Sequence, residues 1–209
     1  LALSHARQVI DAEKSLGIFH EYAWQQAFIH NQLAVKFFNF VYFWLDFPLI
    51  AALGLLMYWK RRRQYTFTRD AILASGAFAL VCYYLYPVAP PRLVPELGII
   101  DSLQAFNNLS YQAQSTSFFV NPYAAMPSLH VGWAVLIAVG VAWAYGGTWR
   151  PVLLLCLLHP LPQWASTVVT GNHFFLDGVG GLVAAAFGLA AAYAMQRWGY
   201  PRLQRLLWR

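Results

Sequence analysis

The chain has 209 residues, of which 59% are hydrophobic and 11% are charged, and its net charge is +6. An ordinary soluble domain carries about a quarter charged residues, so this composition excludes one and favours a surface that faces lipid. The basic residues lie between apolar runs and form no single basic face, so nucleic acid is not a predicted partner. The length suits one membrane-embedded domain over residues 1–209.

Residues 1–36 mix polar and apolar side chains, and the apolar ones fall on one face of a helix. A helix of this kind lies in the plane of a membrane surface with its apolar face in the lipid. We therefore expect residues 1–36 to form an interfacial helix on the outer surface. Its apolar face consists of Val9, Ile10, Leu16, Phe19, Ala23, Trp24, Ala27 and Phe28.

Five later stretches are apolar enough, and long or nearly long enough, to cross a bilayer as helices, which takes about 20 residues. The predicted fold class is therefore all-α, a polytopic transmembrane helical bundle. The chain begins at Leu1 rather than Met, which leaves room for a sixth span upstream. Pro160 and Pro162 are expected to kink the fourth span. The predicted spans are Phe37–Trp59, Ala71–Val88, Ser128–Tyr145, Val152–Thr170 and Phe174–Trp198.

The basic residues predict the orientation of these spans. Ten of the fourteen Lys and Arg residues lie on one side when the spans alternate, and basic loops stay in the cytoplasm. We expect a bacterial plasma membrane, with the loop 89–127 on the extracytoplasmic side. The ten residues are Lys60, Arg61, Arg62, Arg63, Arg69, Arg150, Arg197, Arg202, Arg205 and Arg209.

The third predicted span begins with Pro127-Ser128-Leu129-His130. Proline suits the first turn of a helix because its missing N–H would be unpaired there. The free N–H groups at such a helix start, together with the Ser128 hydroxyl, favour a bound phosphate on the water side. His130 falls in the same turn. Taken alone, the Pro-Ser pair is ordinary helix capping.

The fifth predicted span is entered through Asn172-His173-Phe174-Phe175-Leu176-Asp177. His173 and Asp177 are four residues apart and would share one helix face. A hydrogen bond to Asp177 would leave the second ring nitrogen of His173 free to act as a nucleophile. A carboxylate at this depth in a membrane is a functional candidate. A simple helix-stabilising contact is the alternative.

Arg92 is the only Lys or Arg between the second and third predicted spans. A guanidinium offers paired donors to phosphate oxygens. Counting spans places Arg92, Ser128, His130, His173 and Asp177 at the same outer edge, which favours a shared site over solvated or capping roles. Asp46 lies within the first predicted span, and the sequence assigns it no role.

These residues resemble the type 2 phosphatidic acid phosphatase superfamily. Its signatures are Lys-x6-Arg-Pro, Pro-Ser-Gly-His and Ser-Arg-x5-His-x3-Asp. Pro127 to His130 match the second, with Leu129 for Gly, and Ser166 with His173 and Asp177 match the third. Arg92 matches the arginine of the first. The departures are Leu85 for Lys, Leu93 for Pro and Thr167 for Arg, and the run around Trp164 and His173 looks closest to the inositol phosphorylceramide synthase branch.

The resemblance implies a lipid phosphatase or phosphotransferase with a phosphohistidine intermediate. His173 would be the nucleophile, Asp177 its orienting partner and His130 the acid and base. Arg92, Ser128, Ser166 and Thr167 would hold the phosphate. The donor would be a lipid phosphate or phospholipid, and the acceptor water or an alcohol such as an inositol-containing molecule.

The scheme requires no cofactor and no metal. A plain phosphatase acting on a glycerolipid or an isoprenoid is the first alternative. A zinc or iron hydrolase that uses the same side chains as ligands, and a transporter, are remoter ones.

Overall fold

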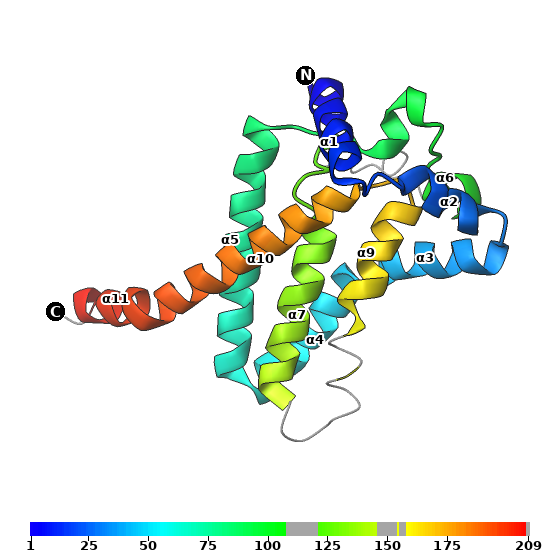
Figure 1. Ribbon diagram of the computed structural model, residues 1–209. Helices are drawn as coiled ribbons and strands as arrows, with labels where there is room; N and C mark the ends of the chain where they lie inside the picture. Colours follow the sequence, from blue (N-terminus) through cyan, green and yellow to red (C-terminus); the bar gives the residue numbers. More distant parts are fainter. Residues whose placement is uncertain (108–120, 146–153, 155–157, 208–209) are drawn as a thin grey trace.

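The computed structural model describes residues 1–107, 121–145, 154 and 158–207, and every regular element among them is helical (Figure 1). The predicted all-α class is confirmed for these residues. The helices are α1 (Ala2–Leu16), α2 (Glu21–Ile29), α3 (Gln32–Trp44), α4 (Phe47–Lys60), α5 (Arg62–Leu85), α6 (Ser102–Asn107), α7 (Leu129–Tyr145), α9 (Pro160–Val169), α10 (Phe175–Ala194) and α11 (Tyr200–Leu207). Shorter turns are η1 (Pro91–Leu93), η2 (Pro95–Leu97) and the π-helical η3 (Met195–Gly199).

The N-terminal segment forms two helices, where one interfacial helix was predicted. Gly17 ends α1 with a φ of 70°, a left-handed conformation that glycine adopts without steric cost. The α1 face with Val9 and Ile10 packs against protein, on a cluster that includes Val88 and Phe174. In this chain the apolar face of α1 therefore covers both ends of the loop between α5 and α7 and the start of α10.

The first predicted span is broken at Leu45 and Asp46. Its two halves, α3 and α4, are bent by 46°. Pro48 explains the break, because proline cannot donate to the helix and its ring clashes with the carbonyl four residues earlier. His159 Nε2 lies 2.8 Å from the Leu45 carbonyl oxygen, which satisfies one acceptor that the break exposes. At this break the carboxylate of Asp46 is buried inside the protein.

The centre of the molecule is a crossing of α5, α7 and α10 (Figure 1). Glycines allow their backbones to touch, as small residues do where membrane helices cross. A Cβ built on Gly181 of α10 would lie 2.3 Å from the Ser128 carbonyl oxygen beside α7, and one on Gly188 would lie 2.3 Å from the Ala71 carbonyl oxygen of α5. This crossing places the start of α10 directly against the start of α7.

Gly181→Ala is expected to force α10 away from α7 and to lower the stability by about 1–3 kcal/mol, the usual cost of overpacking. Thermal unfolding in detergent measures the change. Gly54→Ala is the matched control, since a Cβ on Gly54 of α4 has no atom within 4 Å among the described residues. Equal melting temperatures for the two variants would contradict this account of the crossing.

The predicted set of five spans is not confirmed. Among the described residues, the helical stretch Phe175–Gln204 is long and apolar enough to cross a membrane. The bent pair of α3 and α4 also passes this test if its two helices are counted as one broken span. The second predicted span coincides with α5 from Ala71 to Leu85 and runs past the end of that helix to Val88, and the third matches α7, which is a shorter apolar helix. Of the fourth, the structure describes α9 with 10 residues, and positions 152, 153 and 155–157 lie outside the described residues.

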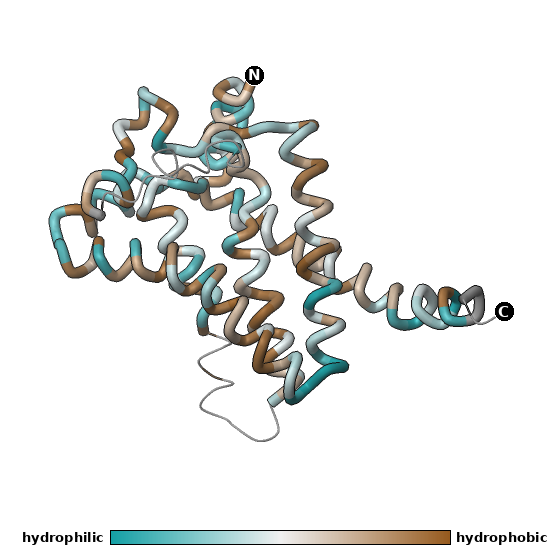
Figure 2. Tube along the Cα trace, turned by 180° about the vertical axis from the view of Figure 1, so that it is seen from behind, coloured by the Kyte–Doolittle hydropathy of each residue, from teal (hydrophilic) through white to brown (hydrophobic). Residues whose placement is uncertain are grey.

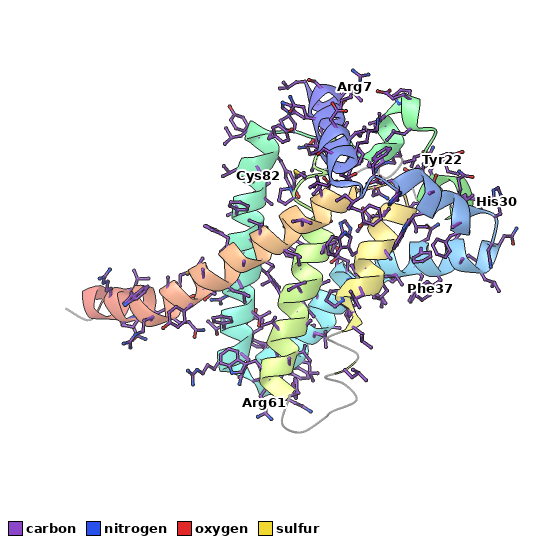
Figure 3. The ribbon with its side chains drawn as sticks, in the orientation of Figure 1. Arg7, Tyr22, His30, Phe37, Arg61 and Cys82 are labelled. Atoms are coloured by element: carbon purple, nitrogen blue, oxygen red, sulfur yellow. The ribbon has the colours of Figure 1, made fainter. Side chains whose placement is uncertain are left out.

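Hydrophilic residues gather at the turn between α4 and α5 and continue into the first half of α5, while α4 is largely hydrophobic (Figure 2). Arg61 marks this turn, and it lies at the end of the molecule opposite Arg7 on α1 (Figure 3). The placement of the basic loop and the loop 89–127 on opposite sides of a membrane stays a prediction. Arg150, Arg209 and positions 108–120 of the loop 89–127 lie outside the described residues.

Candidate active site

A cavity of about 300 Å³ opens where α3, α4, α5 and α7 meet the loop before α7 and the joint before α10. It contains both predicted catalytic histidines and the predicted phosphate-binding arginine, and we call it the two-histidine cavity. Its lining residues are Tyr42, Asp46, Phe47, Tyr83, Pro90, Arg92, Asn121, Pro122, Ala124, Ala125, Leu129, His130, Trp133, Asn172 and His173.

His173 is held in the joint that follows α9. The Thr167 carbonyl oxygen accepts hydrogen bonds from the backbone N–H groups of Asn172 and His173, at 3.1 and 3.0 Å. On the ring, Nδ1 lies 2.7 Å from the Ala125 carbonyl oxygen. A carbonyl oxygen only accepts, so Nδ1 carries the proton and the lone pair is on Nε2. The imidazole is therefore fixed in the tautomer that a nucleophile at Nε2 needs.

Asp177 is the second partner of the same ring nitrogen. Its Oδ2 lies 3.4 Å from His173 Nδ1 and accepts a 2.8 Å hydrogen bond from the Phe174 N–H. His173 precedes α10, which begins at Phe175, so the two side chains do not share a helix face as the spacing predicted. They meet because the extended Phe174 turns the chain into the helix, where Asp177 caps its first turn.

His130 lies in the first turn of α7, as predicted, and faces His173 with 5.6 Å between the ring centroids. Tyr42 of α3 stacks on His130 at 4.2 Å between centroids. A 2.8 Å hydrogen bond from the Ser128 N–H to the Asp177 carbonyl oxygen joins the start of α7 to that of α10. The two imidazoles thus stand on segments connected directly through the backbone.

Asp46 is the site residue that the sequence left without a role. Its side chain is 3% exposed, and its Oδ2 lies 3.4 Å from His130 Nε2. Oδ1 is buried and has no hydrogen-bond partner among the described residues. The available signal was a carboxylate inside an apolar segment, two residues before Pro48. With Asp46, each histidine of the cavity has its own aspartate.

Arg92 lines the cavity and is tied to the joint that carries His173. Its backbone N–H donates to the Gly171 carbonyl oxygen at 3.0 Å, and its Nη1 donates to Asn172 Oδ1. Its Nε lies 3.2 Å from Asp101 Oδ2, so a carboxylate offsets part of its charge.

Ser128, Ser166 and Thr167 are fully buried and are not part of the cavity lining. The Ser166 and Thr167 hydroxyls each donate at 2.7 Å to a carbonyl oxygen of α9, and Ser128 Oγ has no partner among the described residues. The position of Ser128 at a helix start predicted that its hydroxyl faces water. The hydroxyl is instead buried in the protein. A phosphate contact for these three residues stays a prediction.

Within the described residues, no group of three or more His, Cys, Asp and Glu side chains is spaced to hold a metal ion.

Two His–Asp pairs and an arginine lie at one cavity among the described helices, and histidine is one of the side chains that enzymes use as a covalent nucleophile. The chain belongs to the PAP2 superfamily, since the sequence model of that superfamily matches residues 7–191. Membership supports phosphatase or phosphotransferase chemistry on lipid phosphates and confirms the superfamily predicted from the motifs. Comparison with curated proteins and with solved structures gives no significant match.

Proposed function

We propose that this chain is an integral-membrane lipid phosphotransferase that works through a phosphohistidine on His173. One observation carries the proposal: the Ala125 carbonyl oxygen holds Nδ1 of His173 at 2.7 Å, which leaves Nε2 unprotonated beside His130. We place the protein in a bacterial plasma membrane with the cavity on the outer side; the apolar helices and the separated basic turn support a membrane location and this orientation.

In the first step, His173 Nε2 attacks phosphorus in line. The P–N bond forms, the bond from phosphorus to the leaving oxygen breaks, and His130 gives that oxygen its proton. The imidazolium charge that develops on His173 is stabilised by Asp177 Oδ2 and the Ala125 carbonyl oxygen, both near Nδ1. Arg92 offsets the charge on the phosphoryl oxygens.

In the second step, an acceptor hydroxyl attacks the phosphohistidine and His130 takes its proton. The P–N bond breaks and His173 returns to its starting tautomer. Asp46 Oδ2 orients His130 for both proton transfers, and the unpaired Asp46 Oδ1 is available to a hydroxyl of the acceptor. Water as acceptor makes the reaction a phosphatase reaction, and an alcohol makes it a transfer.

The charges around the cavity favour a phosphodiester donor over a phosphate monoester. Arg92 is the one lysine or arginine among the described residues that line it, and Asp101 lies 3.2 Å from that arginine. Asp46 adds a carboxylate to the same wall. A monoester dianion would meet little net positive charge here, whereas a diester carries a single negative charge. We therefore propose transfer of a lipid headgroup phosphate, with an inositol-containing molecule as one candidate participant.

Product analysis tests this function. Purified protein in lipid vesicles receives a labelled phosphodiester lipid or a labelled phosphatidate, with and without inositol or a lipid alcohol as acceptor. We expect the diester to be the better donor and the label to appear on the acceptor in the presence of a chelator. Release of inorganic phosphate from phosphatidate alone would establish a plain phosphatase instead. Activity lost to a chelator and restored by zinc would favour the metal-dependent alternative.

A further inference from the structure

Two buried carboxyl groups outside the proposed mechanism stand at the start of α10. Glu13 comes from α1 and Glu21 from α2, and both are 0% exposed. Each sits on a helix that the sequence assigned to the membrane surface, where a glutamate would face water. Their burial therefore requires partners within the protein.

Those partners are the backbone N–H groups that open α10. Glu21 Oε1 accepts from the Phe175 N–H at 3.1 Å, and Glu13 Oε1 accepts from the Leu176 N–H at 2.7 Å. Asp177 Oδ2 accepts from the Phe174 N–H at 2.8 Å. Three successive N–H groups, which a helix start leaves without helical partners, each have a carboxyl oxygen. The same stretch connects His173 to Asp177.

The two glutamates accept from adjacent N–H groups, so their carboxyl groups are neighbours at the start of α10. Burial raises the pKa of the Glu13 carboxyl to about 9, and a hydrogen bond with Glu21 and the negative charges of Glu21 and Asp177 act in the same direction, against the Leu176 N–H. Oε2 of each glutamate is buried and forms no hydrogen bond with an N–H or O–H group of the described residues. One proton between these two oxygens satisfies both, and leaves the pair with one negative charge at the positive end of α10.

We propose that Glu13 and Glu21 form a proton-sharing carboxyl pair that positions the His173–Asp177 pair for catalysis. They are positioning residues, since they act on the reacting groups through the first turn of α10. The proposal extends the functional site to the N-terminal helices. Its catalytic consequence rests on the proposed role of His173.

The carboxyl pair makes the site sensitive to alkaline pH. Glu13 is faced by Glu21 from α2 and by Asp177 and the Leu176 N–H from α10. The pKa of Glu13 is higher in the folded chain than its ordinary value of 4.5, so protonation favours the folded state. This contribution is complete below about pH 4.5 and is lost as the pH rises through about 9. Above that pH the two carboxylates repel each other and Asp177.

The test compares Glu13→Gln, Glu13→Ala and the wild type from pH 6 to about pH 10, bracketing the raised pKa of Glu13. A glutamine oxygen still accepts from the Leu176 N–H, and its amide still donates to Glu21, without a titrating proton. The control is Asp11→Asn, an exposed carboxylate of the same helix. The two readouts are the melting temperature in detergent and the rate of phosphohistidine formation.

We expect Glu13→Gln to keep wild-type phosphohistidine formation at pH 7 and to remove the alkaline decline in both readouts. Glu13→Ala should slow phosphohistidine formation by about 10²-fold, as small misplacements of reacting groups do. Identical pH profiles for Glu13→Gln and the wild type would overturn the shared proton. If the Glu13 variants change the melting temperature but the wild type forms no phosphohistidine, the positioning role and the proposed function are both overturned. Phosphohistidine formation unaffected by Glu13→Ala would overturn the positioning role alone.

Discussion

Replacing His173 by asparagine is expected to abolish phosphohistidine formation and to lower turnover on the order of 10⁴–10⁶-fold, as loss of a nucleophile does. Asparagine is the informative substitution because its side-chain N–H₂ can still donate to the Ala125 carbonyl oxygen, as Nδ1 does at 2.7 Å. The joint before α10 is then retained while the attacking nitrogen is lost. His173→Ala would remove the attachment as well.

The measurement is trapping of labelled protein after a short reaction. A phosphohistidine is labile in acid and stable in alkali, which distinguishes it from a phosphoserine. His30→Ala is the matched control, since His30 is exposed at the end of α2, away from the cavity. Equal labelling of His173→Asn and the wild type would refute the nucleophile assignment.

His130→Ala is expected to lower turnover by about 10²–10⁴-fold, the range for loss of a general acid and base. The loss should be smaller with a donor whose leaving oxygen needs no proton, such as a nitrophenyl phosphodiester. Steady-state rates on the lipid donor and on the nitrophenyl donor measure this difference. A rate lowered equally on both donors would contradict the assignment of His130 as acid.

Asp46→Asn tests whether the aspartate acts through His130, whose Nε2 lies 3.4 Å from Asp46 Oδ2. Residues that act as one unit have non-additive effects. The single change is expected to lower turnover, and the double variant with His130→Ala should be no slower than His130→Ala alone. Additive losses would show that Asp46 acts independently of His130, for example on the acceptor.

The signature spacing was enough to predict which segments bring His130, His173 and Arg92 to one cavity. Asp46 was beyond sequence reasoning because its partner belongs to a distant helix, and because the helix break at Pro48 decides where its side chain points. Glu13 carried a weak signal: it follows Val9 and Ile10 at helical spacing, so it lies on their buried face. A buried glutamate needs partners, and those partners are backbone groups that no residue pattern reveals.

The composition was enough to predict an all-helical fold, but it did not predict where the helices begin and end. The apolar run from Phe37 to Trp59 is interrupted by only two strongly polar residues, Asn39 and Asp46, so hydropathy still treats it as continuous. Backbone sterics at Pro48 divide it. Likewise the positive φ of Gly17 divides the N-terminal segment, and the first of its two helices packs on the loop and α10 rather than on lipid.

The bond from the Leu176 N–H to Glu13 joins residues 163 positions apart, and the one from Gln25 to the Val169 carbonyl oxygen spans 144 positions. During translation, α1 and α2 leave the ribosome long before α10 is synthesised. The Glu13 carboxyl and the Gln25 amide therefore have none of these hydrogen bonds until α9 and α10 are made. The proposed activity then arises only once α10 has been synthesised. A nascent or prematurely terminated chain would be unable to attack lipids.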